Sequence, residues 1–175
     1  MFLNLQVINF VNKNNLIDKN FVCKNHKGNN ITPHVKWTSI PNVKSYAIVF
    51  EDPDAVNGNF IHWYVPYISN HINELKSFNN KYINISNIHQ INLSKLNLFQ
   101  GKNSLDKIGY HGPCAPKLSG IHNYIFTLYA LDNIIPIDQL KINSSFKFEN
   151  ICKKNNIQII EKDKKIFQYT YPTNL

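Results

Sequence analysis

The sequence contains no arginine, so all 19 of its basic residues are lysines. Arginine is the residue best suited to forked contacts with phosphate and guanine. The formal net charge of +8 is therefore weak evidence for a nucleic-acid partner, and no aromatic-rich RNA-binding signature accompanies it. Asparagine occurs 28 times. We interpret this lysine- and asparagine-rich composition as nucleotide bias acting on a solvated surface, and we expect no nucleic-acid partner.

The sequence also lacks long apolar runs and has few cysteines. No run reaches about 18 apolar residues, so we expect no membrane-spanning segment. Met1–Phe10 has no basic region or small-residue cleavage site, and we interpret it as an early strand or a loose terminus. Cys23, Cys114 and Cys152 share no Cys-x-x-Cys spacing. Their odd number favours free thiols in a reducing compartment, which predicts a cytoplasmic location.

The length and composition predict one packed domain that spans residues 1–175. The hydrophobic fraction of 43% and the aromatic fraction of 13% are typical of a globular core. No internal repeat is visible. Five segments combine β-branched and aromatic residues between Pro, Asn and Gly, and we expect them to be strands: 35–37, 45–51, 61–68, 124–131 and 166–171.

Two other segments complete the expected architecture. Residues 145–155 have helical spacing after Ser144 or Ser145 as the N-cap. Residues 70–107 are rich in Asn, Ser, Lys and Ile with weak periodicity, which indicates a long connection with short strands. The whole pattern predicts a mainly β fold, a sandwich with few helices. The strand 45–51 is apolar on both faces, so we expect it to be central and covered on both sides.

Polar residues flank three of these strands. Asp52 follows the strand 45–51, whereas His62 and His122 stand at the starts of two others. If the first strand pairs antiparallel with the others, these side chains meet at one rim of the sandwich. Rims and loop clusters are where a rigid β scaffold normally carries its function.

These residue types suit the binding of an anion. A carboxylate bonded to one ring nitrogen of a histidine favours its protonated form, and the other N–H then points into the cavity. Two such histidines, with N–H groups from the 109–112 turn, would bind a phosphate or a carboxylate. The expected walls, which also suit a ligand ammonium group, are Phe60, Trp63, Tyr110 and Tyr124.

Each residue also has a purely structural interpretation. Asp52 and Asp54 can cap a turn around Pro53. His62 and His122 can be hydrogen-bonded structural histidines. Trp63 fits a core position better than a ligand wall.

Four segments together resemble the phosphatidylethanolamine-binding protein family, which includes the Raf kinase inhibitor protein. They are Tyr46–Ala55 with the sequence YAIVFEDPDA, Ile61–Val65 with IHWYV, Gly109–Cys114 with GYHGPC, and His122–Asp132. The resemblance runs from about Leu16 to Pro172. The Gly-Pro-Cys form and the short motif spacing are similar to the prokaryotic-type branch of the family.

The resemblance implies a β-sandwich with a few short helices and a small anion pocket. Its ligands would be phosphate or phosphoryl-ethanolamine head groups, with a kinase or a serine-type peptidase as a protein partner and with peripheral membrane contact. The pocket residues that match the family motifs are Asp52, Asp54, His62, Gly112, Pro113, His122 and Tyr124.

Three positions depart from the family pattern. Val56 replaces a second proline after the DPDA motif, and Asn123 replaces the arginine of the His-Arg-Tyr motif. His111 replaces a small residue, so it either adds a third imidazole to the pocket or points into solvent.

The sequence therefore predicts a non-enzymatic, lipid head-group binding protein without a cofactor, a metal ion or catalytic residues. The alternative is a hydrolase that uses the same pocket. Asp52, His62, His111 and His122 offer nitrogen and oxygen ligands for zinc, but no HxxxH spacing supports such a site. Cys114 near His111 or His122 is the other candidate, as a nucleophile.

Overall fold

The computed structural model describes residues 2–78, 97–136 and 146–172. The elements in chain order are β1 (Gln6–Ile8), the 3-10 turn η1 (Lys24–His26), β2 (His34–Lys36), β3 (Ser45–Asp52), β4 (Phe60–Ser69), β5 (Glu74–Leu75), β6 (Leu98–Phe99), β7 (Ile121–Leu131), α1 (Phe148–Lys154) and β8 (Ile159–Thr170).

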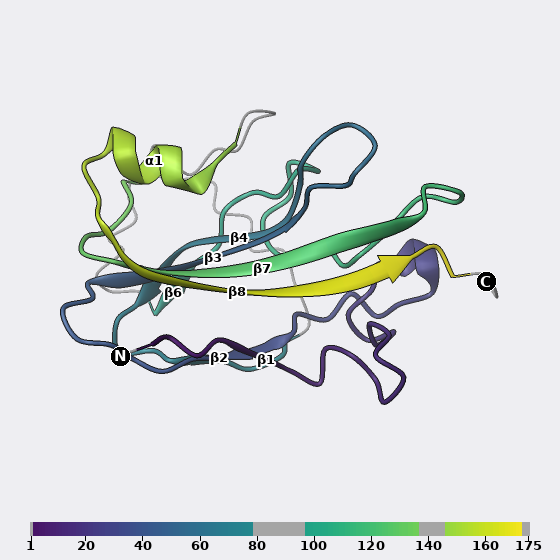
Figure 1. Ribbon diagram of the computed structural model, residues 1–175, viewed down its shortest axis with the longest axis horizontal. Coiled ribbons are helices and arrows are strands. Elements are labelled where there is room, and N and C mark those ends of the chain that lie inside the picture. The colour runs from purple at the N-terminus through teal and green to yellow at the C-terminus, as the bar shows by residue number, and fades with distance from the viewer. Residues whose placement is uncertain (1, 79–96, 137–145, 173–175) are drawn as a thin grey trace.

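The strands form two sheets that pack as a sandwich (Figure 1). The larger sheet has the order β6-β4-β3-β7-β8, and the smaller one has the order β1-β2-β5. All pairings between these strands are antiparallel. The mainly β sandwich expected from the sequence is confirmed, including the early strand within Met1–Phe10.

The strand β3 occupies the centre of the larger sheet and is apolar on both faces. Tyr46, Ile48 and Phe50 point into the core between the two sheets. Ala47 and Val49 point to the opposite face, where a second core forms. This alternation is the period of a strand covered on both sides, as the sequence predicts.

The helix α1 covers the second core, and Figure 1 shows it on the face of the large sheet opposite β1 and β2. Phe148 and Cys152, one turn apart, are its buried residues. The helix begins after Lys147, whose side chain makes no capping hydrogen bond, so a serine N-cap adjoining α1 was wrong. Ser144 and Ser145 lie outside the described residues.

The antiparallel pairing brings the expected polar residues to one rim. Asp52 at the end of β3 is opposite Phe60 at the start of β4, and Glu51 is opposite Ile125 of β7. His62 and His122 therefore lie near the end of β3. Within the described residues, no helix is long and apolar enough to cross a bilayer.

Candidate functional site

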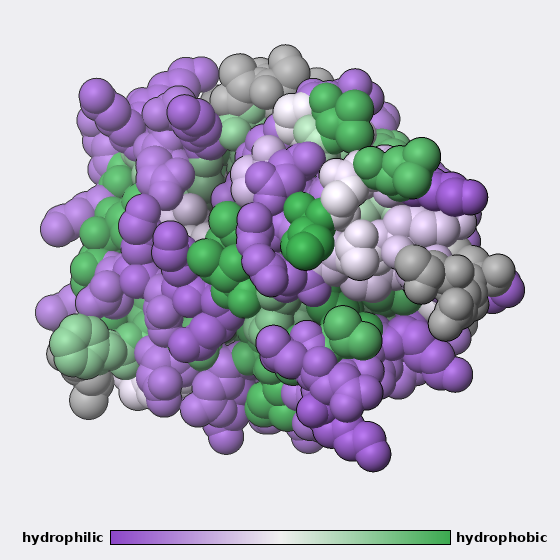
Figure 2. All heavy atoms as spheres, turned by 45° about the vertical axis from the view of Figure 1, so that its right-hand side comes forward, coloured by the Kyte–Doolittle hydropathy of each residue, from purple (hydrophilic) through white to green (hydrophobic). Residues whose placement is uncertain are grey.

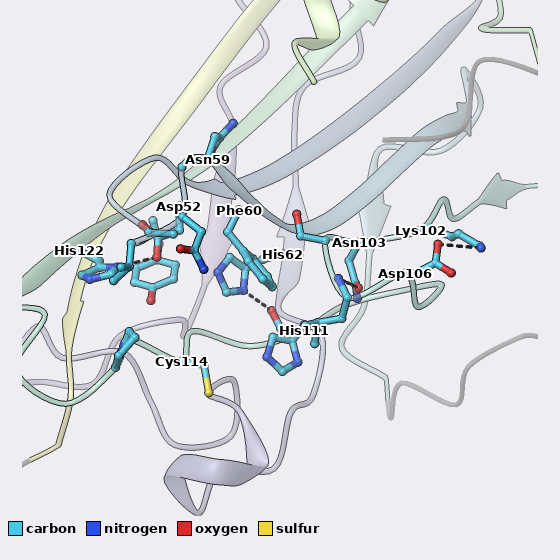
Figure 3. Close-up of a pocket in the computed structure, with 18 residues that line it drawn as sticks. Asp52, Asn59, Phe60, His62, Lys102, Asn103, Asp106, His111, Cys114 and His122 are labelled. Carbon is cyan, nitrogen blue, oxygen red and sulfur yellow. Dashed lines mark hydrogen bonds and ion pairs between the residues drawn. The ribbon is translucent and has the colours of Figure 1, made fainter. Parts of the chain in front are cut away.

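The rim encloses a cavity of about 810 Å³, within the range of small-molecule binding sites. The residues that line it come from β3, β4, β7 and two connecting segments, as Figure 3 shows. They include Asp52, Phe60, His62, Lys102, Asn103, Asp106, His111, Cys114, His122 and Tyr124.

Asp52 and His122 form a buried pair at one side of the cavity. His122 Nδ1 lies 2.7 Å from Asp52 Oδ2, and the two residues are only 1% and 2% exposed. The other ring nitrogen, Nε2, lies 2.9 Å from Ser119 Oγ. Both nitrogens of His122 are thus engaged. From the sequence we expect one N–H of this ring to point into the cavity, and the structure differs in this respect.

His62 is held by the backbone instead of by a carboxylate. Its Nδ1 lies 2.7 Å from the carbonyl oxygen of His111, which makes Nδ1 the protonated nitrogen. Burial lowers the pKa of His62 to about 3, and the neighbouring His111 contributes to this shift. At neutral pH the ring is therefore neutral, and Nε2 carries a lone pair.

His111 and Phe60 lie beside His62. The rings of His62 and His111 are nearly parallel, at an angle of 11° with centroids 5.9 Å apart. Phe60 contacts His62 at a centroid distance of 4.6 Å. Burial lowers the pKa of His111 to about 4, and Lys107 adds to this effect. Of the two interpretations of His111, the structure supports the one that places it at the cavity.

The Tyr124 hydroxyl is buried at the cavity and makes no hydrogen bond of normal geometry to any described residue. The Cys114 backbone and the Asp52 carboxylate are among the groups that influence its pKa. Burial and the Asp52 charge raise the pKa of Tyr124. The phenol therefore keeps its proton and can donate it to a ligand.

The outer wall of the cavity comes from residues 102–106. Asn103 stabilises this turn, because its Oδ1 accepts hydrogen bonds from the Leu105 and Lys107 N–H groups. Ser104 ties the turn to β4, since its Oγ accepts from the Ile61 N–H at 2.8 Å. The Lys102–Asp106 ion pair lies on the exposed side at 2.8 Å. Sequence reasoning missed this wall, because its local signal is Asn103, a residue type that stabilises turns through its side chain.

The phosphatidylethanolamine-binding protein family model matches residues 7–170, which includes all of these elements. The chain belongs to this family. It shares 35% identity over 116 residues with a UPF0098 protein of Aquifex aeolicus, which covers 66% of this chain and 60% of that protein. It shares 31% identity over 134 residues with the UPF0098 protein PH1269 of Pyrococcus horikoshii, which covers 76% and 62%. The matches span less than two thirds of these relatives' lengths.

The fold agrees with this assignment. YbcL of Escherichia coli, described as a member of the mammalian phosphatidylethanolamine-binding protein family, superposes with a TM-score of 0.73. The match covers 98% of this chain and 100% of YbcL at 20% sequence identity. The family name describes binding, so the chain is a member of a ligand-binding family with this sandwich fold.

Several residues that the family motifs imply for the pocket do not line the cavity. Asp54 accepts two hydrogen bonds from Asn123, at 2.8 Å and 2.7 Å, and so joins the turn after β3 to β7. Gly112 and Pro113 lie behind the wall. Trp63 and Tyr110, which we expected as walls from their aromatic side chains and not from the family motifs, belong to the core between the sheets.

The N–H groups of the 109–112 turn are also engaged. Gly109 donates to the Gly101 carbonyl, His111 donates to the His62 carbonyl, and Gly112 donates to Asn30 Oδ1 at 2.7 Å. The expectation that this turn offers its N–H groups to an anion was therefore wrong for these three residues.

The prediction of three free thiols was wrong. Cys23 and Cys114, 91 residues apart, form a disulfide, and Cys152 alone is free and buried. No spacing rule could pair two such distant cysteines, because the fold brings them together. A thiolate nucleophile at Cys114 is excluded in this state. The expectation of a cytoplasmic location rested on free thiols. The disulfide removes that reason, since disulfides persist mainly in oxidising compartments.

Proposed function

We propose that the cavity binds a phosphoryl head group of the phosphate or phosphoryl-ethanolamine type without catalysing a reaction on it. One observation carries this proposal. Asp52, His62, His122 and Tyr124 are polar, at most 3% exposed, and gathered at one cavity. Burial of such groups costs free energy, which Asp52 and His122 offset by pairing with each other. A ligand that pairs with the Tyr124 hydroxyl and with His62 accounts for the position of the other two.

The individual groups suit the two ends of a zwitterionic head group. The Tyr124 hydroxyl donates to a phosphoryl oxygen, and His62 Nε2 takes up a proton or accepts one from a phosphoryl hydroxyl. The ring of Phe60 and the Asp52 carboxylate suit an ammonium group. The cavity of about 810 Å³ exceeds the volume of a head group, which leaves room for the next part of a lipid.

Titration calorimetry with phosphoryl-ethanolamine, inorganic phosphate and phosphotyrosine tests this proposal. We expect binding to the wild type, a large loss of affinity in His62→Gln, and unchanged affinity in His71→Gln, because His71 is an exposed residue outside the cavity. The ranking of the three ligands separates head-group recognition from phosphoprotein recognition. Equal affinities for wild type and His62→Gln would contradict the proposal.

Peripheral membrane contact is the second part of the proposal. Val56 and Leu105 line the cavity although they are 72% and 43% exposed, and Leu118 on the neighbouring loop is 95% exposed. Figure 2 shows this end of the molecule with hydrophobic side chains among hydrophilic ones. These exposed side chains support insertion into a lipid surface that presents its head groups to the cavity. Regulation of a kinase or a peptidase stays a prediction from the family resemblance.

A hydrolase is the second candidate function, and one observation favours it. The Asp52–His122–Ser119 chain of hydrogen bonds has the connectivity of a catalytic triad, with lengths of 2.7 Å and 2.9 Å. However, the Ser119 hydroxyl also lies 2.7 Å from the Pro116 carbonyl and donates to it. A hydroxyl has one proton, so this bond opposes proton transfer to His122.

Hydrolysis of p-nitrophenyl acetate distinguishes the two functions. If the chain is a binding protein, the wild type and Ser119→Ala give equal, slow rates. A wild-type rate that falls at least about 100-fold in both Ser119→Ala and His122→Gln would establish the hydrolase instead.

A further inference from the structure

A second group of chemically reactive side chains lies behind the wall of the cavity. Cys23, His26 and Cys114 each place one potential ligand atom within 4.8 Å of the other two. Cys23 and His26 have Cys-x-x-His spacing around the turn η1, and Cys114 reaches them from the cavity wall. Figure 3 shows the Cys114 sulfur directed toward this turn and away from Asp52 and His122.

Contacts other than the S–S bond hold the two cysteines together. The Cys23 N–H donates to the Pro113 carbonyl at 3.1 Å. Gly112 packs so closely on the backbone of Phe21 and Val22 that an added Cβ would clash with it. These contacts involve the residues next to Cys114, so both sulfurs stay close to each other after the disulfide is reduced.

The ring of His26 is already oriented. Its Nδ1 lies 3.0 Å from the Tyr169 hydroxyl, which leaves Nε2 available to a ligand. Tyr169 and Tyr171 flank the ring at centroid distances of 5.8 Å and 5.0 Å. A metal-ligating histidine is commonly fixed by a hydrogen bond at its other nitrogen, and the Tyr169 hydroxyl would supply that bond to an Nε2 ligand. His26 is half-buried, so an ion can reach it from solvent.

We infer that the reduced protein binds one Zn²⁺ ion through the Cys23 and Cys114 thiolates and a nitrogen of His26. Two thiolates and one imidazole form a zinc ligand set that leaves a fourth position for water. A dithiol reductant opens the site: it is oxidised to a disulfide, and two electrons and two protons pass to Cys23 and Cys114. Zn²⁺ then displaces the two thiol protons.

Disulfide and zinc are thus alternative cross-links at the same place. Each ties the loop of η1 to Cys114, which lines the cavity, and each leaves Cys152 unused. The metal site does not depend on the proposed head-group function. It predicts that this cross-link of the cavity wall persists under both oxidising and reducing conditions.

Metal titration of the full chain tests the inference. The protein is reduced with a dithiol, desalted without oxygen, and titrated with Co²⁺, whose thiolate absorption band reports sulfur ligation. Zn²⁺ displacement of Co²⁺ then gives the zinc affinity. We expect one ion per reduced chain and none in the oxidised chain. His26→Ala should weaken Zn²⁺ binding at least about tenfold, since even outer residues of zinc sites have effects of that size.

Three controls make the result specific. Cys23→Ser should abolish the Co²⁺ thiolate band, Cys152→Ala should leave it unchanged, and His34→Ala should leave the Zn²⁺ affinity unchanged. The fold of His26→Ala is checked in its oxidised form, where the disulfide is intact. A reduced wild type without a thiolate band, or equal Zn²⁺ affinity in His26→Ala and wild type, overturns the inference.

Discussion

His122 Nδ1 and Asp52 Oδ2 lie 2.7 Å apart, and this buried contact joins the start of β7 to the end of β3. Removal of one partner from a buried pair leaves the other without compensation, which costs about 3 kcal/mol. We expect Asp52→Asn and His122→Gln each to lower the free energy of unfolding by about this amount. Urea denaturation of both variants and of the double variant measures it.

The double variant tests whether the two side chains act as a unit. The double variant should lose less unfolding free energy than the sum of the losses in the two single variants, by more than about 1 kcal/mol. Additive losses would show that the contact contributes little.

The pH dependence of ligand binding follows from the neutral histidines. The pKa values of about 3 for His62 and about 4 for His111 belong to the empty cavity, and a bound anion raises them. The complex therefore takes up protons, and affinity increases as the pH falls from neutral toward these values. Glycerophosphoryl-ethanolamine is the appropriate ligand for calorimetry, because its phosphodiester does not titrate in this window. Constant affinity from pH 8 to pH 5 would exclude a coupled histidine.

The same shift predicts acid sensitivity of the empty protein. Unfolded His62 takes up a proton below its ordinary pKa of about 6.5, whereas the folded residue does so only near 3. Stability is therefore full above about pH 6.5 and decreases as the pH falls toward 3, with a loss of about 2 kcal/mol at pH 5. His62→Gln should lack this part of the loss. Thermal unfolding of this variant, the wild type and His71→Gln at several pH values checks it.

Gly112 is a site where any side chain should disturb the cavity wall. A Cβ there would lie 2.6 Å from the Val22 carbonyl carbon and closer still to the Phe21 oxygen. We expect Gly112→Ala to cost about 3 kcal/mol and to weaken head-group binding, since His111 and Cys114 must shift. Gly120→Ala is the control, because Gly120 does not line the cavity: its Cβ would meet no atom within 4 Å, and its positive φ of 85° costs about 1 kcal/mol. Equal losses of unfolding free energy in Gly112→Ala and in the control variant would show that the backbone around Gly112 moves to accommodate a side chain.

The disulfide makes a quantitative prediction for thiol content and stability. Under denaturing conditions the native protein should give one reactive thiol, Cys152, and three after reduction. A cross-link across 91 residues contributes about 4.6 kcal/mol by the chain-entropy model, so Cys114→Ser should lower the unfolding free energy by about that amount. Three thiols in protein purified without reductant would mean that the bond does not form.

Membrane contact and head-group recognition are separable by mutation. Leu118→Asp removes the most exposed of the large hydrophobic side chains near the cavity without touching its lining. We expect weaker binding to vesicles that contain phosphatidylethanolamine and unchanged calorimetry with soluble phosphoryl-ethanolamine. Unchanged vesicle binding in this variant would contradict the membrane-contact proposal.

The sequence by itself determined the strands and the rim on which the site lies. Alternating apolar residues in 45–51 specify a strand covered on both faces, and antiparallel pairing then brings Asp52, His62 and His122 together. Local patterns are sufficient for this step because side-chain direction in a strand has a fixed period of two. The family motifs could be read for the same reason, since each lies at the end of one such strand.

Only the tertiary structure decided how these residues are paired. The bonds of His62 to the His111 carbonyl, of His122 to Asp52, and of Cys23 to Cys114 join segments that no periodicity relates. The charge state of His62 also depends on its burial, which results from packing of the whole core and cannot be read from residues adjacent in the sequence. The hydrogen bonds and the disulfide between distant segments could therefore be known only from the tertiary structure. The position of the site at one rim of the sandwich could be predicted from the sequence.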